Sequence, residues 1–287
     1  MYKKFKQYLK RYSLVDKAHR SLYRNLLCLK LWLRDVASAY LSRSTKMKIT
    51  PLGFKLMGSN LIHHLAMQEG KFEPEETGLF KEHFRNTDVF VDVGANIGFY
   101  TCLARSVDKH VIAIEPMPKN LEYLYANLLG NNWNDVEVFP VGLKDSPGIA
   151  TLYGGSSTGA SLIGNWAGSS MLFRHKISVS TLDILLSNRF AGEKILIKID
   201  VEGAEYPVLL GATKVMCLEP KPVWIVEICL NEFYPNGANP HFQETFNLFW
   251  QYGYEARTAD RANKLIQRTD VERWVKDGRC SSGTINY

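Results

Sequence analysis

The sequence VFVDVGANIG, at residues 89–98, predicts the fold of this chain. Its first half is an apolar run rich in β-branched residues, which is typical of a strand buried within a parallel sheet. Gly94 and Gly98 interrupt the run, and a helical pattern of apolar residues follows them. A strand, a tight glycine turn and a helix start form the first βα unit of a nucleotide-binding α/β sheet.

The glycine turn differs from a dinucleotide-binding turn at one position. In a Gly-x-Gly-x-x-Gly motif the middle glycine lets a pyrophosphate approach the backbone, and here that position is Asn96. Asp92 also places negative charge where a phosphate would be repelled. S-adenosylmethionine has no phosphate, and its amino group and sulfonium favour carboxylates and carbonyls. The turn therefore favours this cofactor over a nicotinamide dinucleotide, although Gly94 and Gly98 would equally suit a plain βα turn.

A second acidic residue follows at the distance expected for a ribose-binding group. The segment HVIAIEP, at residues 110–116, predicts the next strand, and Glu115 lies 23 residues after Asp92. An acid about 20 residues beyond the glycine turn, at the tip of the second strand, binds ribose hydroxyls in related sheets. An ionised carboxylate can accept both hydroxyl protons of a ribose. The alternative is that Glu115 is a helix N-terminal acid beside Pro116.

Three motifs together resemble the FkbM family of S-adenosylmethionine-dependent methyltransferases. They are DVGANIG at 92–98, IEP at 114–116 and IKIDVEGAE at 197–205, with Gly211-Ala212 downstream. The third motif is the most distinctive, and the resemblance extends from about residue 70 to about residue 257. It implies methylation of hydroxyl oxygens, including those of sugars, glycosides and polyketide products.

We expect an α/β fold in two parts. Residues 49–287 should form a Rossmann-like class I methyltransferase domain, with a mostly parallel sheet, helices on both faces and a terminal antiparallel hairpin. Further strands are expected at 136–143, 193–200 and 222–228, and the hairpin at 253–257 and 265–267. Residues 1–48 should form a basic, amphipathic helical extension.

The extension carries the basic excess of the chain. Residues 1–50 hold thirteen Lys and Arg residues against Asp16 and Asp35, a balance of +11, so the remainder carries −5 of the total of +6. Apolar residues recur in it at spacings of three and four: Leu22, Leu26, Leu29, Leu33 and Val36. The apolar run is shorter than the roughly 20 residues of a bilayer span and has no signal-peptide pattern. The extension could pack on the domain as a cap, lie on an anionic membrane surface, or hold a partner chain or nucleic acid.

Two further cofactor contacts are expected. A Gly-x-Phe-Glu segment that ends at Glu73 resembles the family pattern that lines the methionine end of the cofactor, although Glu73 would also suit a helix N-terminus. The end of the strand at 136–143 should approach the adenine, where Asp145 or backbone amides could bind its exocyclic amine. Residues 154–170 are rich in Gly, Ser and Thr and predict a functional loop that forms a substrate wall.

An alcohol nucleophile has to lose a proton, so a base near the methyl group should assist methyl transfer. Asp200, Glu202 and His175 are the candidates in that order, and Asp200 is also expected to orient the cofactor. Asp200 and Glu202 leave a strand end two residues apart, so an extended backbone would direct both to one side. A metal-assisted version would use Asp200, Glu202 or Glu227 with Mg²⁺, but no motif in the sequence calls for a metal.

Composition and motifs restrict the other functional classes to which the chain could belong. The five cysteines form no Cys-x-x-Cys pair and do not cluster with histidines, which predicts reduced thiols in a cytoplasmic protein without a zinc site. A nucleic-acid methyltransferase is one alternative because of the basic extension, but no Asn-Pro-Pro-Tyr-like element follows the fourth strand. A non-catalytic module that binds cofactor or partner is the other.

Overall fold

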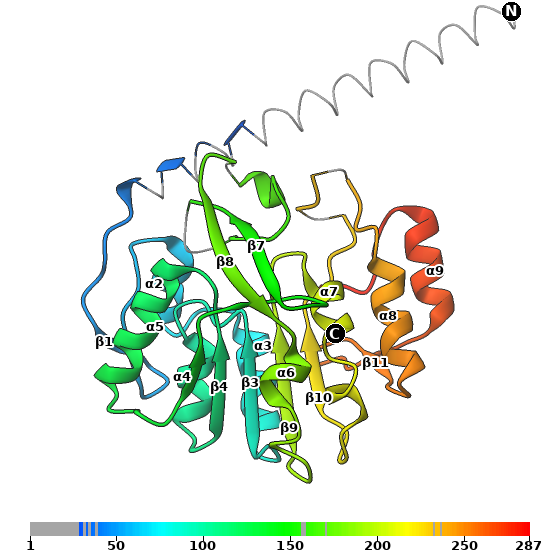
Figure 1. The fold of residues 1–287 in the computed structure, drawn as a ribbon, viewed down its shortest axis with the longest axis horizontal. Helices are drawn as coiled ribbons and strands as arrows, with labels where there is room; N and C mark the ends of the chain where they lie inside the picture. The colour runs from blue at the N-terminus through cyan, green and yellow to red at the C-terminus, as the bar shows by residue number, and fades with distance from the viewer. Residues whose placement is uncertain are drawn as a thin grey trace, which may run out of the picture.

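A five-stranded parallel sheet forms the centre of the computed structural model (Figure 1). Its strands follow the order β10-β9-β3-β4-β5, and all four pairings are parallel. They are β3 (Val89–Val93), β4 (His110–Ile114), β5 (Glu137–Phe139), β9 (Ile195–Ile199) and β10 (Val223–Val226). The chain leaves β3 toward β4 and β5, then crosses back to β9, so the order reverses beside β3. Ligands of open α/β sheets bind at such a reversal, outside the carboxyl ends of the strands.

The structure describes residues 29–30, 33, 36–37, 40–155, 159–169, 171–231, 233–235 and 237–287. Most of the predicted N-terminal extension, residues 1–48, therefore lies outside the described residues. Within them, no helix combines the length and the hydropathy that crossing a membrane would require.

Helices cover both faces of the sheet because successive strand residues point to opposite faces. Val91 and Ile197 face a cluster completed by the later helices, whereas Phe90 and Leu196 face a cluster completed by the earlier ones. The earlier helices are α2 (Ile62–Gln68), α3 (Pro74–Phe84), α4 (Phe99–Arg105) and α5 (Pro118–Gly130). The later ones are α6 (Leu182–Leu186), α7 (Glu205–Leu210), α8 (Phe242–Gln251) and α9 (Arg268–Asp277). The expected α/β class, with helices on both faces, is confirmed.

The strand expected at 136–143 is wrong as a single element. It is divided into β5 and β6 (Gly142–Leu143), and β6 belongs to a separate sheet of order β6-β8-β7. Pro140 lies between the two pieces, and proline has no backbone N–H to donate to a strand ladder. The second sheet is completed by β7 (Gly148–Tyr153) and β8 (Arg174–Ser180), whose antiparallel ladder rises beyond the carboxyl ends of the central strands (Figure 1).

The predicted antiparallel hairpin is formed by two short strands, β11 (Ala256–Arg257) and β12 (Leu265–Ile266), and α9 follows it. A second short antiparallel pair precedes α2 near the N-terminal side of the domain. It is formed by β1 (Lys48–Ile49) and β2 (Lys55–Leu56). Helix α9 was not predicted, although its start carries a sequence signal. Gln267 and Asp270 form a reciprocal capping box there.

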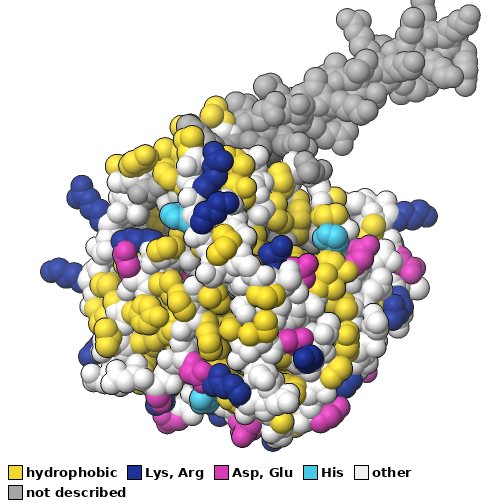
Figure 2. Space-filling model, viewed as in Figure 1, with side chains coloured by type: hydrophobic (Ala, Val, Ile, Leu, Met, Phe, Trp, Pro, Cys, Tyr) yellow, Lys and Arg dark blue, Asp and Glu magenta, His cyan; other side chains and the backbone are white. Residues whose placement is uncertain are grey.

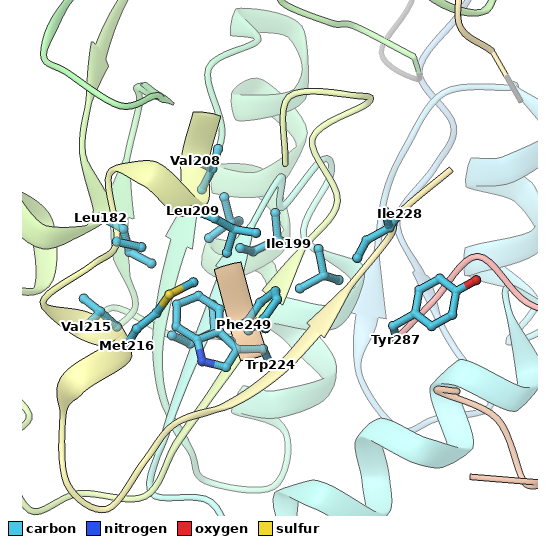
Figure 3. Close-up of a cluster of buried hydrophobic side chains, with 14 of the residues drawn as sticks. Leu182, Ile199, Val208, Leu209, Val215, Met216, Trp224, Ile228, Phe249 and Tyr287 are labelled. Carbon is cyan, nitrogen blue, oxygen red and sulfur yellow. The ribbon is translucent and has the colours of Figure 1, made fainter. Parts of the chain in front are cut away.

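The larger core lies between the sheet and helices α6 to α9 (Figure 3). Val208 and Leu209 of α7 are fully buried and meet Ile199 of β9 and Phe249 of α8 in this cluster. This packing fixes α7 directly after the β9 turn, so the core holds the carboxyl end of β9 in place.

We expect Leu209→Ala to lower the free energy of unfolding by about 2–5 kcal/mol, because it removes fully buried methyl groups and leaves a cavity. The neighbouring Leu210 is 39% exposed, so Leu210→Ala should change that free energy by only about 0.5 kcal/mol. Urea denaturation measures both. Equal effects of the two variants would contradict this description of the α7 core.

Candidate active site

The turn after β3 passes so close to the end of β9 that only glycine fits at its first position. Gly94 has φ +85°, and a Cβ there would lie 1.9 Å from the carbonyl oxygen of Asp200. Gly94 therefore brings the backbones of β3 and β9 together at their carboxyl ends. Asn96, with φ +52°, completes the turn and accepts a hydrogen bond from the Ile97 amide at 2.8 Å through its own Oδ1.

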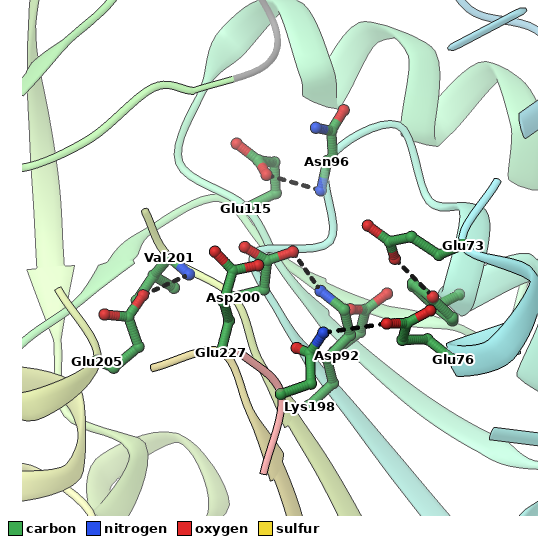
Figure 4. A network of polar contacts seen from close by, with 12 residues as sticks. Glu73, Glu76, Asp92, Asn96, Glu115, Lys198, Asp200, Val201, Glu205 and Glu227 are labelled. Carbon is green, nitrogen blue, oxygen red and sulfur yellow. Dashed lines mark hydrogen bonds and ion pairs between the residues drawn. The ribbon is translucent and has the colours of Figure 1, made fainter. Parts of the chain in front are cut away.

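Glu115, at the tip of β4, has a carboxylate that is held by two backbone amides. Its Oε2 accepts from the Asn96 N–H and its Oε1 from the Met117 N–H, both at 2.8 Å (Figure 4). Burial raises the pKa of Glu115 to about 7. The Asn120 side chain hydrogen-bonds this carboxylate as well. The two carboxylate oxygens have four lone pairs in total, so three protein contacts leave acceptor capacity for a ligand hydroxyl.

A cavity of about 80 Å³ opens beside Glu115, and we call it the β3–β4 cavity. Its walls come from the ends of β3, β4, β6 and β9 and from the loop between β7 and β8. Five of the predicted site residues line it together: Gly94, Asn96, Glu115, Asp200 and Glu202. Gly98 starts α4 with φ +86°, and its Cα faces Leu124 of α5.

Lys198 of β9 is a buried cation surrounded by carboxylates. Its side chain is 7% exposed, and Nζ lies 3.0 Å from Oδ2 of Asp200. Burial alone would lower the pKa of Lys198, but the carboxylates of Asp200, Asp92 and Glu73 raise it above its usual value. Lys198 was not predicted as a site residue, because it stands within a strand that otherwise reads as apolar.

Asp92 faces Lys198 across the strand pair β3–β9. It is 1% exposed, and its Oδ2 accepts a hydrogen bond from the Thr101 hydroxyl at 2.7 Å. Its Oδ1 has no hydrogen-bond partner among the described residues. Burial raises the pKa of Asp92. The structure therefore places a buried carboxylate with a free acceptor under the glycine turn rather than on the cavity wall.

A second, much smaller cavity lies on the other side of Asp200, and we call it the α3–β10 cavity. Its polar lining residues are Glu73, Glu76, Tyr100, Lys198, Asp200, Glu227 and Asn286. Glu73 begins α3 and accepts from the Tyr100 hydroxyl at 2.7 Å. Asp200 is the one described residue that lines both cavities.

Two of the three glutamates that line the α3–β10 cavity have raised pKa values. Burial, together with the charge of Asp200, raises the pKa of Glu73 to about 7. The same two causes raise the pKa of Glu227 well above its usual value. Burial beside Asp200 therefore favours the protonated forms of Glu73 and Glu227, which can donate hydrogen bonds.

Glu202 does not share the orientation expected from an extended backbone, so that part of the prediction is wrong. It has φ +57°, which turns the chain away from the strand direction after Asp200. Its Oε2 accepts from the Trp166 indole N–H at 2.6 Å. Burial raises the pKa of Glu202 to about 7. Glu202 still lines the β3–β4 cavity, but its carboxylate is occupied by Trp166.

Trp166 fastens the loop of residues 159–169 to the turn after β9. Its side chain is 1% exposed, and its ring lies so close to Gly203 that a Cβ there would lie 2.4 Å from a ring carbon. Ser161 adds a hydroxyl hydrogen bond to the Glu202 carbonyl at 2.6 Å. Trp166 also packs edge-to-face on Tyr234, with ring centroids 4.7 Å apart. The loop thus forms one wall of the β3–β4 cavity through Gly159, Ala160 and Leu162, and its role as a substrate wall stays a prediction.

Glu205 has a structural role in the turn after β9. Its Oε1 accepts from the Gly203 N–H at 2.9 Å and the Val201 N–H at 3.3 Å, so it ties down the turn that begins α7. Glu205 is buried and lines neither of the two cavities.

Two predicted residues are not brought to these cavities. Asp145 is exposed and lies 3.8 Å from Lys144, whereas its neighbours Gly142 and Leu143 do line the β3–β4 cavity. His175 lies on β8 opposite Leu152 and lines neither cavity. Among the described residues, no group of three or more His, Cys, Asp or Glu side chains is arranged to hold a metal ion.

The largest described cavity, of about 590 Å³, lies elsewhere, between α3, β10, α8 and β11. None of the predicted site residues lines it. We place the chemistry at the smaller cavities because the perturbed carboxylates and the strand carboxyl ends meet there.

Comparison with known proteins supports the class of the domain. The family described as Methyltransferase FkbM domain matches residues 92–256, which is more than half of the chain. No curated protein sequence matches the chain. Among solved structures, a precorrin-6y C5,15-methyltransferase from Geobacter metallireducens is 12% identical, covers 65% of this chain and 76% of its own, and has a TM-score of 0.38. A SAM-dependent methyltransferase from Aquifex aeolicus is 14% identical over 63% and 81%, with a TM-score of 0.35.

We expect Trp166→Phe to destabilise the protein by about 1–3 kcal/mol, because the buried Glu202 carboxylate loses its indole donor. In a Glu202→Ala background the same tryptophan substitution should cost clearly less, because no carboxylate remains to lose the donor. Chemical denaturation of the four proteins of this double-mutant cycle measures the coupling. Additive effects would show that the indole–carboxylate contact does not hold the loop.

Proposed function

This chain belongs to the FkbM methyltransferase family, and we propose that it transfers a methyl group from S-adenosylmethionine to a hydroxyl oxygen of a sugar, glycoside or other small-molecule or glycan acceptor. The observation that carries this proposal is the position of Asp200. Its carboxylate lies between a cavity suited to an adenosyl group and a polar cavity suited to an acceptor hydroxyl.

The chemistry of the β3–β4 cavity supports the cofactor. Glu115 accepts hydrogen bonds from two backbone amides and the Asn120 side chain, and the acceptor capacity that remains on its carboxylate suits a ribose hydroxyl. None of the residues that line this cavity is Lys or Arg, so a pyrophosphate would lack a cationic partner. A cationic sulfonium and an ammonium group suit the acidic residues that line this cavity, which include Glu115 and Asp200.

The cavity has to widen to admit a cofactor of this size. Its volume of about 80 Å³ is below the range of roughly 300–1,000 Å³ that is typical of small-molecule pockets. The loop of residues 159–169 is a wall of this cavity that belongs neither to the central sheet nor to the sheet of β6, β7 and β8. We infer that binding displaces this loop and that the Trp166–Glu202 contact stabilises its closed position.

The side chains around Asp200 suit the deprotonation of an alcohol. When bound, the cofactor supplies an electrophilic methyl group and a neutral leaving group. Asp200 accepts the hydroxyl proton, and its ion pair with Lys198 fixes the orientation of the carboxylate. Protonated Glu73 or Glu227 can donate a hydrogen bond that positions the acceptor. Glu202 is less suited to act as the base because Trp166 occupies its carboxylate, and His175 lies outside both cavities.

We expect S-adenosylhomocysteine to raise the melting temperature of the wild-type protein. A ligand at about 100 times its Kd adds roughly 2.7 kcal/mol to the free energy of unfolding. Glu115→Gln should reduce the ligand-induced shift, because an amide cannot accept two ribose hydroxyl hydrogen bonds as a carboxylate does. Asp145→Asn is the matched control, since Asp145 is exposed and lies off the cavity, and its shift should equal that of wild type.

The outcomes of this thermal-shift experiment separate the alternatives. Absence of a shift for folded wild-type protein at saturating ligand would contradict the cofactor assignment. A larger loss in Asp145→Asn than in Glu115→Gln would place the adenosyl group elsewhere. A normal shift without turnover of any acceptor would favour a non-catalytic cofactor-binding module.

We expect Asp200→Asn to lower the rate of methyl transfer by about 10²- to 10⁴-fold, the usual contribution of a general base. His175→Ala, at a residue outside both cavities, should change the rate little. The measurement is transfer of labelled methyl groups to a panel of hydroxylated sugars and glycosides, with ligand-induced thermal shifts to verify cofactor binding. A large rate loss in His175→Ala with full activity in Asp200→Asn would reverse the assignment of the base.

A further inference from the structure

The described part of the N-terminal segment presents an apolar helical stripe that is not buried by the domain. Residues 29, 30, 33, 36, 37, 40 and 41 are helical. Leu29, Leu33, Tyr40 and Leu41 recur at helical spacing on one side, and their exposed fractions are 53%, 52%, 76% and 69%. A helix that capped the domain would bury this stripe. A cap is one of the three roles that the sequence leaves open for the extension, and it does not account for these four exposed side chains.

The stripe continues onto the rim of the catalytic domain. The Tyr40 ring packs edge-to-face on Phe173, with centroids 5.9 Å apart, just before β8. The adjacent Leu172 is 71% exposed. Phe173 lies four residues beyond the loop that forms one wall of the β3–β4 cavity. We call these residues, Leu29, Leu33, Tyr40, Leu41 and Leu172, the apolar rim.

Basic side chains surround the apolar rim. Lys30 and Arg43 are exposed beside it in the N-terminal segment, and Arg174 is exposed on β8. Figure 2 shows hydrophobic side chains in yellow close to dark-blue Lys and Arg side chains at the upper end of this view. No acidic residue occurs among residues 36–68 of the sequence. The surface thus combines exposed leucines with cationic flanks.

The combination of exposed leucines and basic side chains distinguishes between the partners that could bind this stripe. A second copy would bring another segment of charge +11 against the first, which opposes self-association at low salt. A nucleic acid would match the charge, but leucine side chains offer no stacking surface for bases. An amphipathic helix with leucines on one face and Lys and Arg around them matches an anionic lipid interface in both properties.

We propose that the apolar rim, with its basic flanks, binds the surface of an anionic lipid bilayer. The leucines enter the boundary between headgroups and acyl chains, and Lys30, Arg43 and Arg174 contact lipid phosphates. Because the rim adjoins the loop over the β3–β4 cavity, this contact holds that side of the domain at the membrane. The proposal does not depend on which acceptor is methylated or on whether methyl transfer occurs.

The test is sedimentation of the full chain with vesicles of phosphatidylcholine alone and of phosphatidylcholine with 30% phosphatidylserine. We expect binding to the anionic vesicles only, weakened when the salt concentration is raised. Leu33→Asp combined with Leu41→Asp should reduce the partition coefficient at least tenfold. Val275→Asp is the matched control, because Val275 is 42% exposed on α9, and it should bind like wild type. Thermal unfolding verifies that all variants are folded.

Four results would overturn the proposal. Folded wild-type protein could fail to sediment with anionic vesicles, or the double variant could sediment as well as wild type. Alternatively, light scattering could show a wild-type dimer that the double variant abolishes, without vesicle binding, which would assign the stripe to a second copy. Binding of an RNA homopolymer that the double variant leaves unchanged, again without vesicle binding, would assign the basic residues to nucleic acid.

Discussion

The ion pair between Lys198 and Asp200 is the interaction on which the arrangement of the site depends. Among the described residues, Lys198 is the only lysine or arginine that is buried. A buried ammonium group is costly unless carboxylates surround it, and removing one partner of such a pair costs about 3–5 kcal/mol. Lys198 therefore requires Asp92 from β3 and Asp200 at the end of β9, and these acids in turn are tolerated because of Lys198. This mutual requirement concentrates negative charge at the carboxyl ends of the central strands.

The same constraint organises the two cavities around that charge. Asp200 separates them, since it lines both. On one side Glu115 is fixed by two backbone amides and presents a rigid acceptor surface. On the other side Glu73 and Glu227 have raised pKa values because they are buried beside Asp200. The cationic methyl donor and the neutral hydroxyl acceptor would therefore be bound by chemically different surfaces. One cluster of acidic residues supplies both surfaces. The loop of residues 159–169 closes the β3–β4 cavity on one side. Because Trp166 of this loop hydrogen-bonds Glu202, closure is coupled to the turn that follows Asp200.

The parts that the sequence predicted correctly depend on local spacing. The strand, glycine turn and helix at 89–105 follow from residues close together in the chain, and the position of Glu115 follows from the length of one βα unit. Pairs distant in sequence could not be predicted in this way. Trp166 was visible as an aromatic residue in a polar loop, but its partner Glu202 lies 36 residues away. Lys198 is a charged residue in an otherwise apolar strand, and its neighbouring carboxylates, except for that of Asp200, come from residues that are distant in the sequence. The position of Asp145 could not be predicted for another reason. Pro140 divides the preceding strand, and the residues that follow belong to a separate sheet.

The central claim is that the β3–β4 cavity holds the adenosyl group of the methyl donor. A crystal structure of the protein with S-adenosylhomocysteine tests it most directly. The account predicts both ribose hydroxyls within hydrogen-bond distance of the Glu115 carboxylate, with the loop of residues 159–169 displaced from its position against Gly203. A nucleoside bound in the large cavity between α3, β10, α8 and β11, or one that makes no contact with Glu115, would contradict it.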